Sequence, residues 1–166
     1  MAYIRRATPD DAAWLQASFP VMGWAKPDGY FATCCQLQDD NQIVLLVAAD
    51  GDSYRGHVKV VWTPTYAYFR DNAIPEIQDL SVLPAHRRLG IATLLLDAAE
   101  NLIRQRSPIA GIGFALYSDY GAAQRMYVLR GYVPDGNGVV YREEYAPPGE
   151  QVTVDDDLIL YLTKSL

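Results

Sequence analysis

Cysteine and histidine are scarce in this chain. It holds two cysteines, Cys34 and Cys35, and two histidines among 166 residues. Neighbouring cysteines close no loop that would stabilise a fold, so the sequence does not describe a disulfide scaffold. These four side chains also lack the spacing of a zinc site, and we therefore expect no bound metal. The two thiols are expected to be reduced and buried.

Long apolar runs are also missing from the sequence. No uninterrupted apolar stretch approaches the roughly 18 residues that a membrane helix needs. The opening residues lack the apolar core of a secretory signal. These two features predict a cytoplasmic protein without a membrane partner.

Basic residues are outnumbered by acidic ones. Fourteen Lys and Arg against twenty Asp and Glu give a formal net charge of −6. Nucleic-acid-binding domains usually present a basic face, so we expect no nucleic-acid partner. Half of the residues are apolar and a fifth are charged, which is typical of a globular protein. The length predicts a single domain over residues 1–166.

Hydrophobic periodicity predicts an alternation of strands and helices. Apolar runs favour strands at 3–7, 43–49, 54–62, 74–82, 111–117 and 158–163, with a short strand starting at 132. Helical spacing favours helices at 9–19, 30–37, 91–105 and 119–130. The segments 63–75 and 134–157 are rich in turn residues and are expected to be loops.

These elements predict an α/β (α+β) fold. A helix at 91–105 joins the strands at 76–82 and 111–117, so those strands should be parallel neighbours. The remaining connections favour a mixed, mostly antiparallel central sheet of six to seven strands, with helices on both faces.

A short motif stands between a predicted strand and a predicted helix in the middle of the chain. Arg87-x-x-Gly90-x-Ala92 places two small residues at a helix start, and Arg88 adds a second positive charge. The first N–H groups of a helix have no partner within it and carry a partial positive charge. The motif therefore predicts a site for a diphosphate. Its spacing matches neither a P-loop nor the three-glycine dinucleotide motif.

Two longer stretches carry a resemblance to a known family. Val82-x-Pro84-x-x-Arg87-Arg88-x-Gly90-Ile91-Ala92-Thr93-x-Leu95-Leu96 resembles the acetyl-CoA-binding motif of the GNAT N-acetyltransferases. Further along, Ala123-x-x-x-Tyr127-x-x-x-Gly131-Tyr132 resembles the second motif of that superfamily, which often ends in Gly-Phe. The order of the predicted elements also fits the family over nearly the whole chain. The resemblance implies a GNAT-like domain that works as an acetyl-CoA-dependent N-acyltransferase.

The resemblance also implies which residues contact acetyl-CoA. The pyrophosphate loop of the family falls on Arg87, Arg88, Leu89, Gly90, Ile91, Ala92 and Thr93. The strand that pairs with the pantetheine arm maps to Leu80, Ser81 and Val82. The N–H near Leu80 is the implied donor to the thioester oxygen as negative charge develops there. Tyr120 departs from the family, because many relatives carry an asparagine that touches the cofactor at that position.

The chemistry of the family needs a base and an acid. Glu76 lies eleven residues before Arg87, where several GNAT enzymes carry a glutamate base. Asp79 competes for that role, and a water chain is a third way to remove the proton. On an undistorted strand Glu76 and Leu80 share one face and Asp79 lies on the other, although a bulge, usual in the family, would disturb this parity. Tyr127 matches the tyrosine that protonates the leaving thiolate.

The sequence thus favours transfer of an acetyl group from acetyl-CoA, by direct attack, to a primary amine of a small molecule or peptide. A non-catalytic acyl-CoA-binding sensing or interaction module is the alternative. His57 and His86 are expected to be structural or solvated rather than catalytic. Substrate choice should come from the loops at 20–29, 63–75 and 134–157. The last strand leaves a homodimer open.

Overall fold

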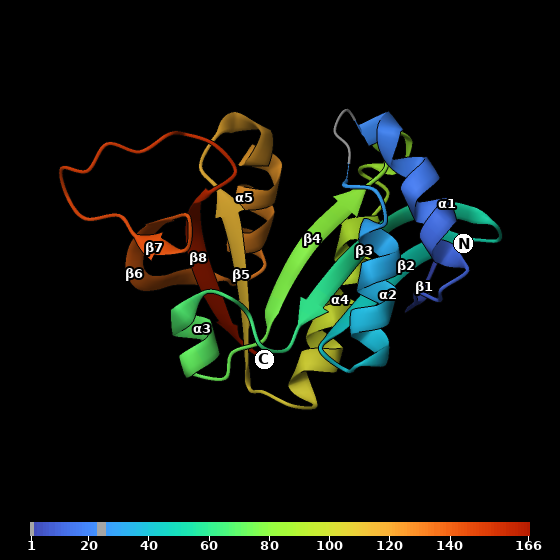
Figure 1. Cartoon of the computed structure of the whole chain (residues 1–166), viewed down its shortest axis with the longest axis horizontal. Helices are drawn as coiled ribbons and strands as arrows, with labels where there is room; N and C mark the ends of the chain where they lie inside the picture. Colours follow the sequence, from blue (N-terminus) through green and yellow to red (C-terminus); the bar gives the residue numbers. More distant parts are fainter. Residues whose placement is uncertain (1, 23–25) are drawn as a thin grey trace.

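A computed structural model describes residues 2–22 and 26–166, and within them the strands form one eight-stranded sheet (Figure 1). Across the sheet the order is β1-β2-β3-β4-β5-β8-β6-β7. The strands are β1 Tyr3–Arg6, β2 Ile43–Asp50, β3 Ser53–Val61, β4 Glu76–Val82, β5 Ile109–Ala115, β6 Val133–Tyr141, β7 Glu144–Tyr145 and β8 Leu158–Ser165. The α-helices are α1 Asp11–Ser18, α2 Tyr30–Asp39, α3 Ala67–Asp71, α4 Ile91–Arg104 and α5 Gly121–Leu129.

The two halves of the sheet meet at β4 and β5. These strands run parallel, as expected, because α4 crosses between them, whereas the other neighbouring strands pair antiparallel. Their register holds two residue pairs, Glu76 with Gly111 and Ile77 with Ile112. Beyond Ile77 the strands separate, and Figure 1 shows their C-terminal ends pointing apart.

Helices cover both faces of the sheet, as the sequence predicts. One face carries α4 and α5 over the main core, in which Leu95 and Leu96 of α4 are fully buried. The other face carries α1 and α2, with Phe31 at the centre of a second core. Further along that face, Phe69 of α3 packs against Gly111 of β5. Burying each large apolar side chain of this kind stabilises the fold by about 1.5–3 kcal/mol.

Two segments expected to be loops contain regular structure. The segment 63–75 holds the short helix α3, whose Phe69 is fully buried over a β5 glycine that leaves room for the ring. The segment 134–157 holds most of β6 and all of β7, which raises the strand count to eight instead of six to seven. Pro, Asp, Asn and Gly at 134–138 read as a turn, and the register of β6 against β8 does shift there. Pairing with β8 on both sides of that shift overrides the local preference.

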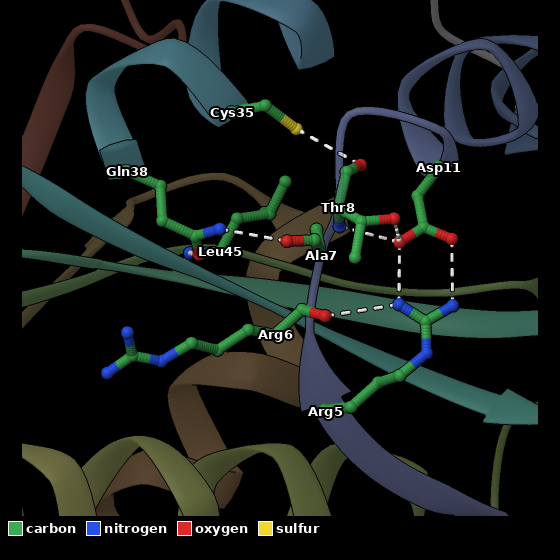
Figure 2. A network of polar contacts seen from close by, with 8 residues as sticks. All are labelled: Arg5, Arg6, Ala7, Thr8, Asp11, Cys35, Gln38 and Leu45. Carbon is green, nitrogen blue, oxygen red and sulfur yellow. Dashed lines mark hydrogen bonds and ion pairs between the residues drawn. The ribbon is translucent and has the colours of Figure 1, made fainter. Parts of the chain in front are cut away.

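Polar contacts attach the end of β1 to the helices α1 and α2 (Figure 2). Arg5 donates two hydrogen bonds to the carboxylate of Asp11, at 2.6 and 2.8 Å. The backbone N–H and the hydroxyl of Thr8 donate to the same carboxylate, at 2.7 and 2.9 Å. Gln38 of α2 donates to the carbonyl oxygen of Ala7 at 2.8 Å. α1 begins at Asp11 with Asp10 as its N-cap, two residues later than the sequence predicts, and Asp11 accepts these hydrogen bonds from the residues before the helix.

A buried carboxylate joins α4 to the segment after α5 and to β8. Glu100 is 4% exposed and accepts hydrogen bonds from Arg130 at 2.7 and 3.0 Å, from Tyr132 at 3.0 Å and from Lys164 at 2.9 Å. Burial raises the pKa of Glu100, but the hydrogen bonds from Arg130 and Lys164 outweigh it and lower the pKa below its usual value. Both oxygens are occupied, so this carboxylate belongs to the stability of the fold.

We expect Glu100→Ala to lower the free energy of unfolding at pH 7 by about 3 kcal/mol, because it removes the buried carboxylate that Arg130, Tyr132 and Lys164 share. Urea denaturation followed by circular dichroism measures this loss. Asp97→Ala is the matched control, because Asp97 pairs with the same arginine but is exposed, and should cost less than about 1 kcal/mol. Since the folded pKa of Glu100 lies below the unfolded one, its contribution is lost as the pH falls, so the gap between wild type and Glu100→Ala should shrink toward pH 4. An equal loss for the two substitutions would contradict this account.

Candidate active site

A bulge interrupts β4 at Asp79. His57 of β3 pairs with Ser81 and Lys59 pairs with Gln78, so two residues of β4 lie opposite one residue of β3. The backbone of Asp79 has a φ of +55°, in the left-handed region. The family resemblance implies a bulge on this strand, and it lies here.

The bulge changes which side chains share a face. Glu76 pairs in register with Gly111, whose α-carbon faces Phe69 of α3, so Glu76 points to the α1–α2–α3 face. Asp79 points to that same face and contacts α2. Leu80 packs instead against the core under α4. The undistorted strand predicted that Glu76 and Leu80 share a face and that Asp79 lies on the other, and the bulge reverses this.

Glu76 is buried at the point where β4 separates from β5. Its side chain is 5% exposed, and Gln78 donates a hydrogen bond to it at 2.9 Å. Burial raises the pKa of Glu76 to about 7, with a further upward contribution from Glu143 and a downward one from the charge of Lys59. A carboxyl group with this pKa exchanges a proton readily near neutral pH.

Asp79 has the opposite electrostatic environment. Its carboxylate lies 2.7 Å from the ammonium of Lys26 and 3.1 Å from Nε2 of His57, and it accepts a hydrogen bond from Tyr30 at 2.8 Å. Burial raises the pKa of Asp79, but the contact with His57 and the ammonium charge and hydrogen bond of Lys26 outweigh it. The pKa therefore lies well below its usual range, and Asp79 is ionised at neutral pH.

Tyr127 lies on α5, in the core on the face of the sheet opposite to the one to which Glu76 points. Its ring is 6% exposed and packs between Phe114 and Tyr132, with ring centroids 6.3 and 6.2 Å away. No described residue hydrogen-bonds its hydroxyl, and burial raises the pKa of that hydroxyl. Tyr120, at the start of the same helix, donates a hydrogen bond to Asp156 at 3.0 Å. Tyr127 thus holds a proton that no other described side chain engages.

The loop before α4 has the geometry of an anion site. Arg88 has a φ of +61° and Gly90, the N-cap of α4, has a φ of +78°. The backbone N–H groups from Arg88 to Thr93 donate no hydrogen bond to any described residue. Arg87 and Arg88 are both exposed beside them. Unpartnered N–H groups, a helix start and two guanidinium groups together suit a diphosphate.

Two hollows lie on the face to which Glu76 points. One, of about 390 Å³, lies between α3 and the β6–β7 hairpin and is lined by Glu143, Glu144 and several tyrosines. Glu143, which lines this hollow, also contributes to the raised pKa of Glu76. The other, of about 420 Å³, is lined by Lys59 and by Gln78, the hydrogen-bond partner of Glu76. Glu76 itself lines neither hollow, but each hollow holds a residue that interacts with it.

The sequence did not identify the partners of Asp79. Lys26 and Tyr30 come from the segment 26–30, around 50 residues away in the chain, and no local pattern links them to β4. His57 was expected to be structural, and it is fully buried. A histidine inside an apolar strand is a signal that such a partner exists, because a buried imidazole needs hydrogen bonds. Of the expected specificity loop at 20–29, residues 23–25 lie outside the described residues.

Two features are absent from residues 2–22 and 26–166, a metal-binding cluster and a membrane-spanning helix. No group of three His, Cys, Asp or Glu side chains there is placed to hold a metal ion. No helix there is long and apolar enough to span a membrane.

Solved structures with similar folds are acetyltransferases. An acetyltransferase of the GNAT family from Streptococcus pneumoniae has a TM-score of 0.69 at 17% identity, covering 100% of both chains. A candidate acetyltransferase from Salmonella typhimurium, solved with its cofactor acetyl-CoA, has a TM-score of 0.69 at 17% identity, covering 99% of this chain and 94% of the other. A ribosomal-protein-alanine N-acetyltransferase from Brucella melitensis has a TM-score of 0.68 at 19% identity, covering 99% of each. At such identities these likenesses establish the fold.

Sequence comparison establishes the family. No curated protein matches the chain. The model of the acetyltransferase (GNAT) family matches residues 9–132, which includes both motifs, β4 and the start of α4. The enzyme class and the co-substrate expected from the sequence, an acetyl-CoA-dependent N-acyltransferase, are confirmed with it. Since the match covers well over half of its length, the chain belongs to the acetyltransferase (GNAT) family.

Proposed function

We propose that this acetyltransferase moves the acetyl group directly to a primary amine of a small molecule or peptide, with Glu76 as the base and Tyr127 as the acid. The observation that carries the proposal is the buried carboxyl group of Glu76, with a pKa of about 7, at the point where β4 leaves β5. A group of this kind is suited to take a proton from an ammonium ion near neutral pH.

Acetyl-CoA supplies the acyl group as a thioester, and the residues along β4 and the α4 loop fit it. We assign the diphosphate to the free N–H groups of the loop and to its two arginines, Arg87 and Arg88. The assigned loop consists of Arg87, Arg88, Leu89, Gly90, Ile91, Ala92 and Thr93. The pantetheine arm is assigned to Leu80, Ser81 and Val82, where β4 has no pairing with β5. Tyr120, on the α5 side of the separation, completes the proposed contacts.

Glu76 then prepares the acceptor. Its carboxylate takes a proton from the ammonium group, directly or through water, and the neutral nitrogen forms a bond to the thioester carbon. The proposed donor to the negative charge that develops on the thioester oxygen is the N–H of Leu80, beside the bulge. Such a donor lowers the barrier by about 3–4 kcal/mol. The nitrogen then loses its remaining extra proton to solvent, the carbon–sulfur bond breaks, and Tyr127 gives its proton to the leaving thiolate and regains one from solvent.

Glu76 is favoured over Asp79 as the base. Asp79 has a lowered pKa, and its carboxylate is engaged by Lys26, His57 and Tyr30. A carboxylate held in this way is a weak proton acceptor, because protonation would break its contacts. Glu76 has one hydrogen-bond donor and an environment that favours its protonated form.

The acceptor is proposed to reach Glu76 from the face of the two hollows. The hollow beside α3 carries Glu143 and Glu144 together with Tyr66, Tyr68 and Tyr145. Carboxylates and aromatic rings favour cationic groups, which suits an amine that arrives protonated. Its volume, about 390 Å³, is that of a small-molecule pocket.

We expect Glu76→Gln to lower kcat/KM at pH 7 by about a hundredfold, because the amine loses its proton acceptor. In wild type the rate should rise with pH through about 7 as Glu76 ionises, and this rise should be absent from the variant. Thiol release from acetyl-CoA with an amine panel, measured from pH 5 to 9, gives the profiles. Glu143→Gln is the control: it should keep the rise but move it to lower pH, because Glu143 raises the pKa of Glu76. A profile for Glu76→Gln identical to that of wild type would remove Glu76 as the base.

We expect Tyr127→Phe to lower kcat by about a hundredfold while the Kd for acetyl-CoA changes less than about twofold, because only the proton of the leaving group is lost. Stopped-flow thiol release and calorimetric titration measure the two quantities. Tyr132→Phe makes the same chemical change on the neighbouring ring, which bonds Glu100. That control should lower stability but keep kcat. Binding of acetyl-CoA without thiol release from wild type with any amine would instead favour the non-catalytic binding module.

A further inference from the structure

Asp79 has an unusual backbone conformation for its place in the fold. Six non-glycine residues among those described have a positive φ, and Asp79 is the one that lies within a strand. The other five lie in turns or loops. Aspartate adopts the left-handed region more readily than most residues but still prefers other conformations. Its conformation here therefore needs support from its surroundings.

Three side chains supply that support, each from a different part of the chain. His57 comes from β3, Tyr30 from α2 and Lys26 from the connection before α2. Their polar atoms lie 3.1, 2.8 and 2.7 Å from the Asp79 carboxylate. The ammonium of Lys26 also lies 4.8 Å from the centroid of the Tyr30 ring. The carboxylate is thus drawn toward β3 and α2, on the side of β4 away from β5.

His57 is itself fixed in place. It is fully buried between the rings of Phe19 and Phe31, with centroids 5.5 and 5.2 Å away. Its Nδ1 lies within hydrogen-bond distance of the Tyr54 hydroxyl. Its Nε2 lies 3.1 Å from the Asp79 carboxylate, in contact with it but without a well-formed hydrogen bond. An imidazole packed between two rings and held at Nδ1 is a rigid support.

We propose that Tyr54, His57, Tyr30 and Lys26 form a side-chain lock that holds Asp79 in its left-handed conformation and thereby fixes the backbone of Leu80. The proposal rests on the proposed function, in which the N–H of Leu80 stabilises the developing charge. Leu80 pairs with no residue of β3 or β5 in the described sheet, so its orientation depends on the bulge. Asp79 is thus a positioning residue, and it acts on the reaction through Leu80.

His57→Leu tests the lock, because leucine fills much of the same space and donates no hydrogen bond. We expect kcat to fall at least tenfold, with the KM for acetyl-CoA changed less than threefold. Tyr30→Phe removes a single hydroxyl and preserves packing, so it should lower kcat about threefold even if His57→Leu does not fold. If both variants fold and keep the kcat of wild type, the lock has no role.

A change at Asp79 separates positioning from a direct role. Glycine accepts a positive φ without support, whereas alanine has neither the carboxylate nor that freedom. We therefore expect kcat of Asp79→Gly to exceed that of Asp79→Ala at least fivefold. In the Asp79→Gly background, His57→Leu should change kcat less than twofold. Equal kcat values for the glycine and alanine variants, or the same tenfold loss in both backgrounds, would overturn the proposal.

Hydrogen–deuterium exchange tests the lock independently of the proposed function. We expect the peptide containing Leu80 and Ser81 to exchange at least fivefold faster in His57→Leu than in wild type. The peptide of β5 that contains Phe114 serves as the control and should be unchanged. If wild type released no thiol with any amine, the proposed function would fail, yet this measurement would still test the lock. Unchanged exchange at Leu80 in a folded His57→Leu variant would contradict it.

Discussion

The short pairing between β4 and β5 is the constraint on which the rest of the site depends. The two strands share two residue pairs and then separate, because each follows its own half of the sheet. The crossover helix α4 begins beyond the end of β4, so its unpartnered N–H groups lie near the separation. Glu76 lies one residue before the strands separate, and Tyr127 lies on α5. The proposed binding groups, base and acid all lie on elements that flank this departure from a continuous sheet.

The two acids of β4 have opposite pKa shifts because their surroundings differ. Glu76 and Asp79 are three residues apart and point to the same face because of the bulge. Aromatic packing from α3 covers the strand position beside Glu76, and one amide bonds it, so burial raises its pKa. Asp79 is also buried, but a lysine and a tyrosine bond its carboxylate and a histidine contacts it, and its pKa falls. The number of donors, rather than burial alone, decides which carboxyl group can exchange a proton near neutral pH.

Local sequence predicted the parts of the molecule that depend on local chemistry. The loop at 87–93, the amphipathic helix after it and the parallel pair follow from glycine, arginine and apolar spacing. The same reasoning missed α3 and most of β6, because packing of Phe69 on Gly111 and pairing with β8 decide those segments. Sequence patterns also could not predict the exact position of the bulge in β4. The sequence around Asp79 does not indicate a positive φ. The side chains that contact its carboxylate come from residues 22 to 53 positions earlier in the chain.

Asp79, at the bulge, connects the face proposed for the acceptor to the part of β4 proposed to hold acetyl-CoA. A glycine would adopt the same φ, but it would leave β4 without polar attachment to α2 and to the connection before it. With Asp79 in place, the backbone next to Leu80 depends on Lys26 and Tyr30, which lie on the face proposed for the acceptor. Movement of α2 or of that connection would therefore alter the strand proposed to hold the thioester. In the proposed site, side chains on the acceptor side would thus control the geometry on the acetyl-CoA side, through the carboxylate of Asp79.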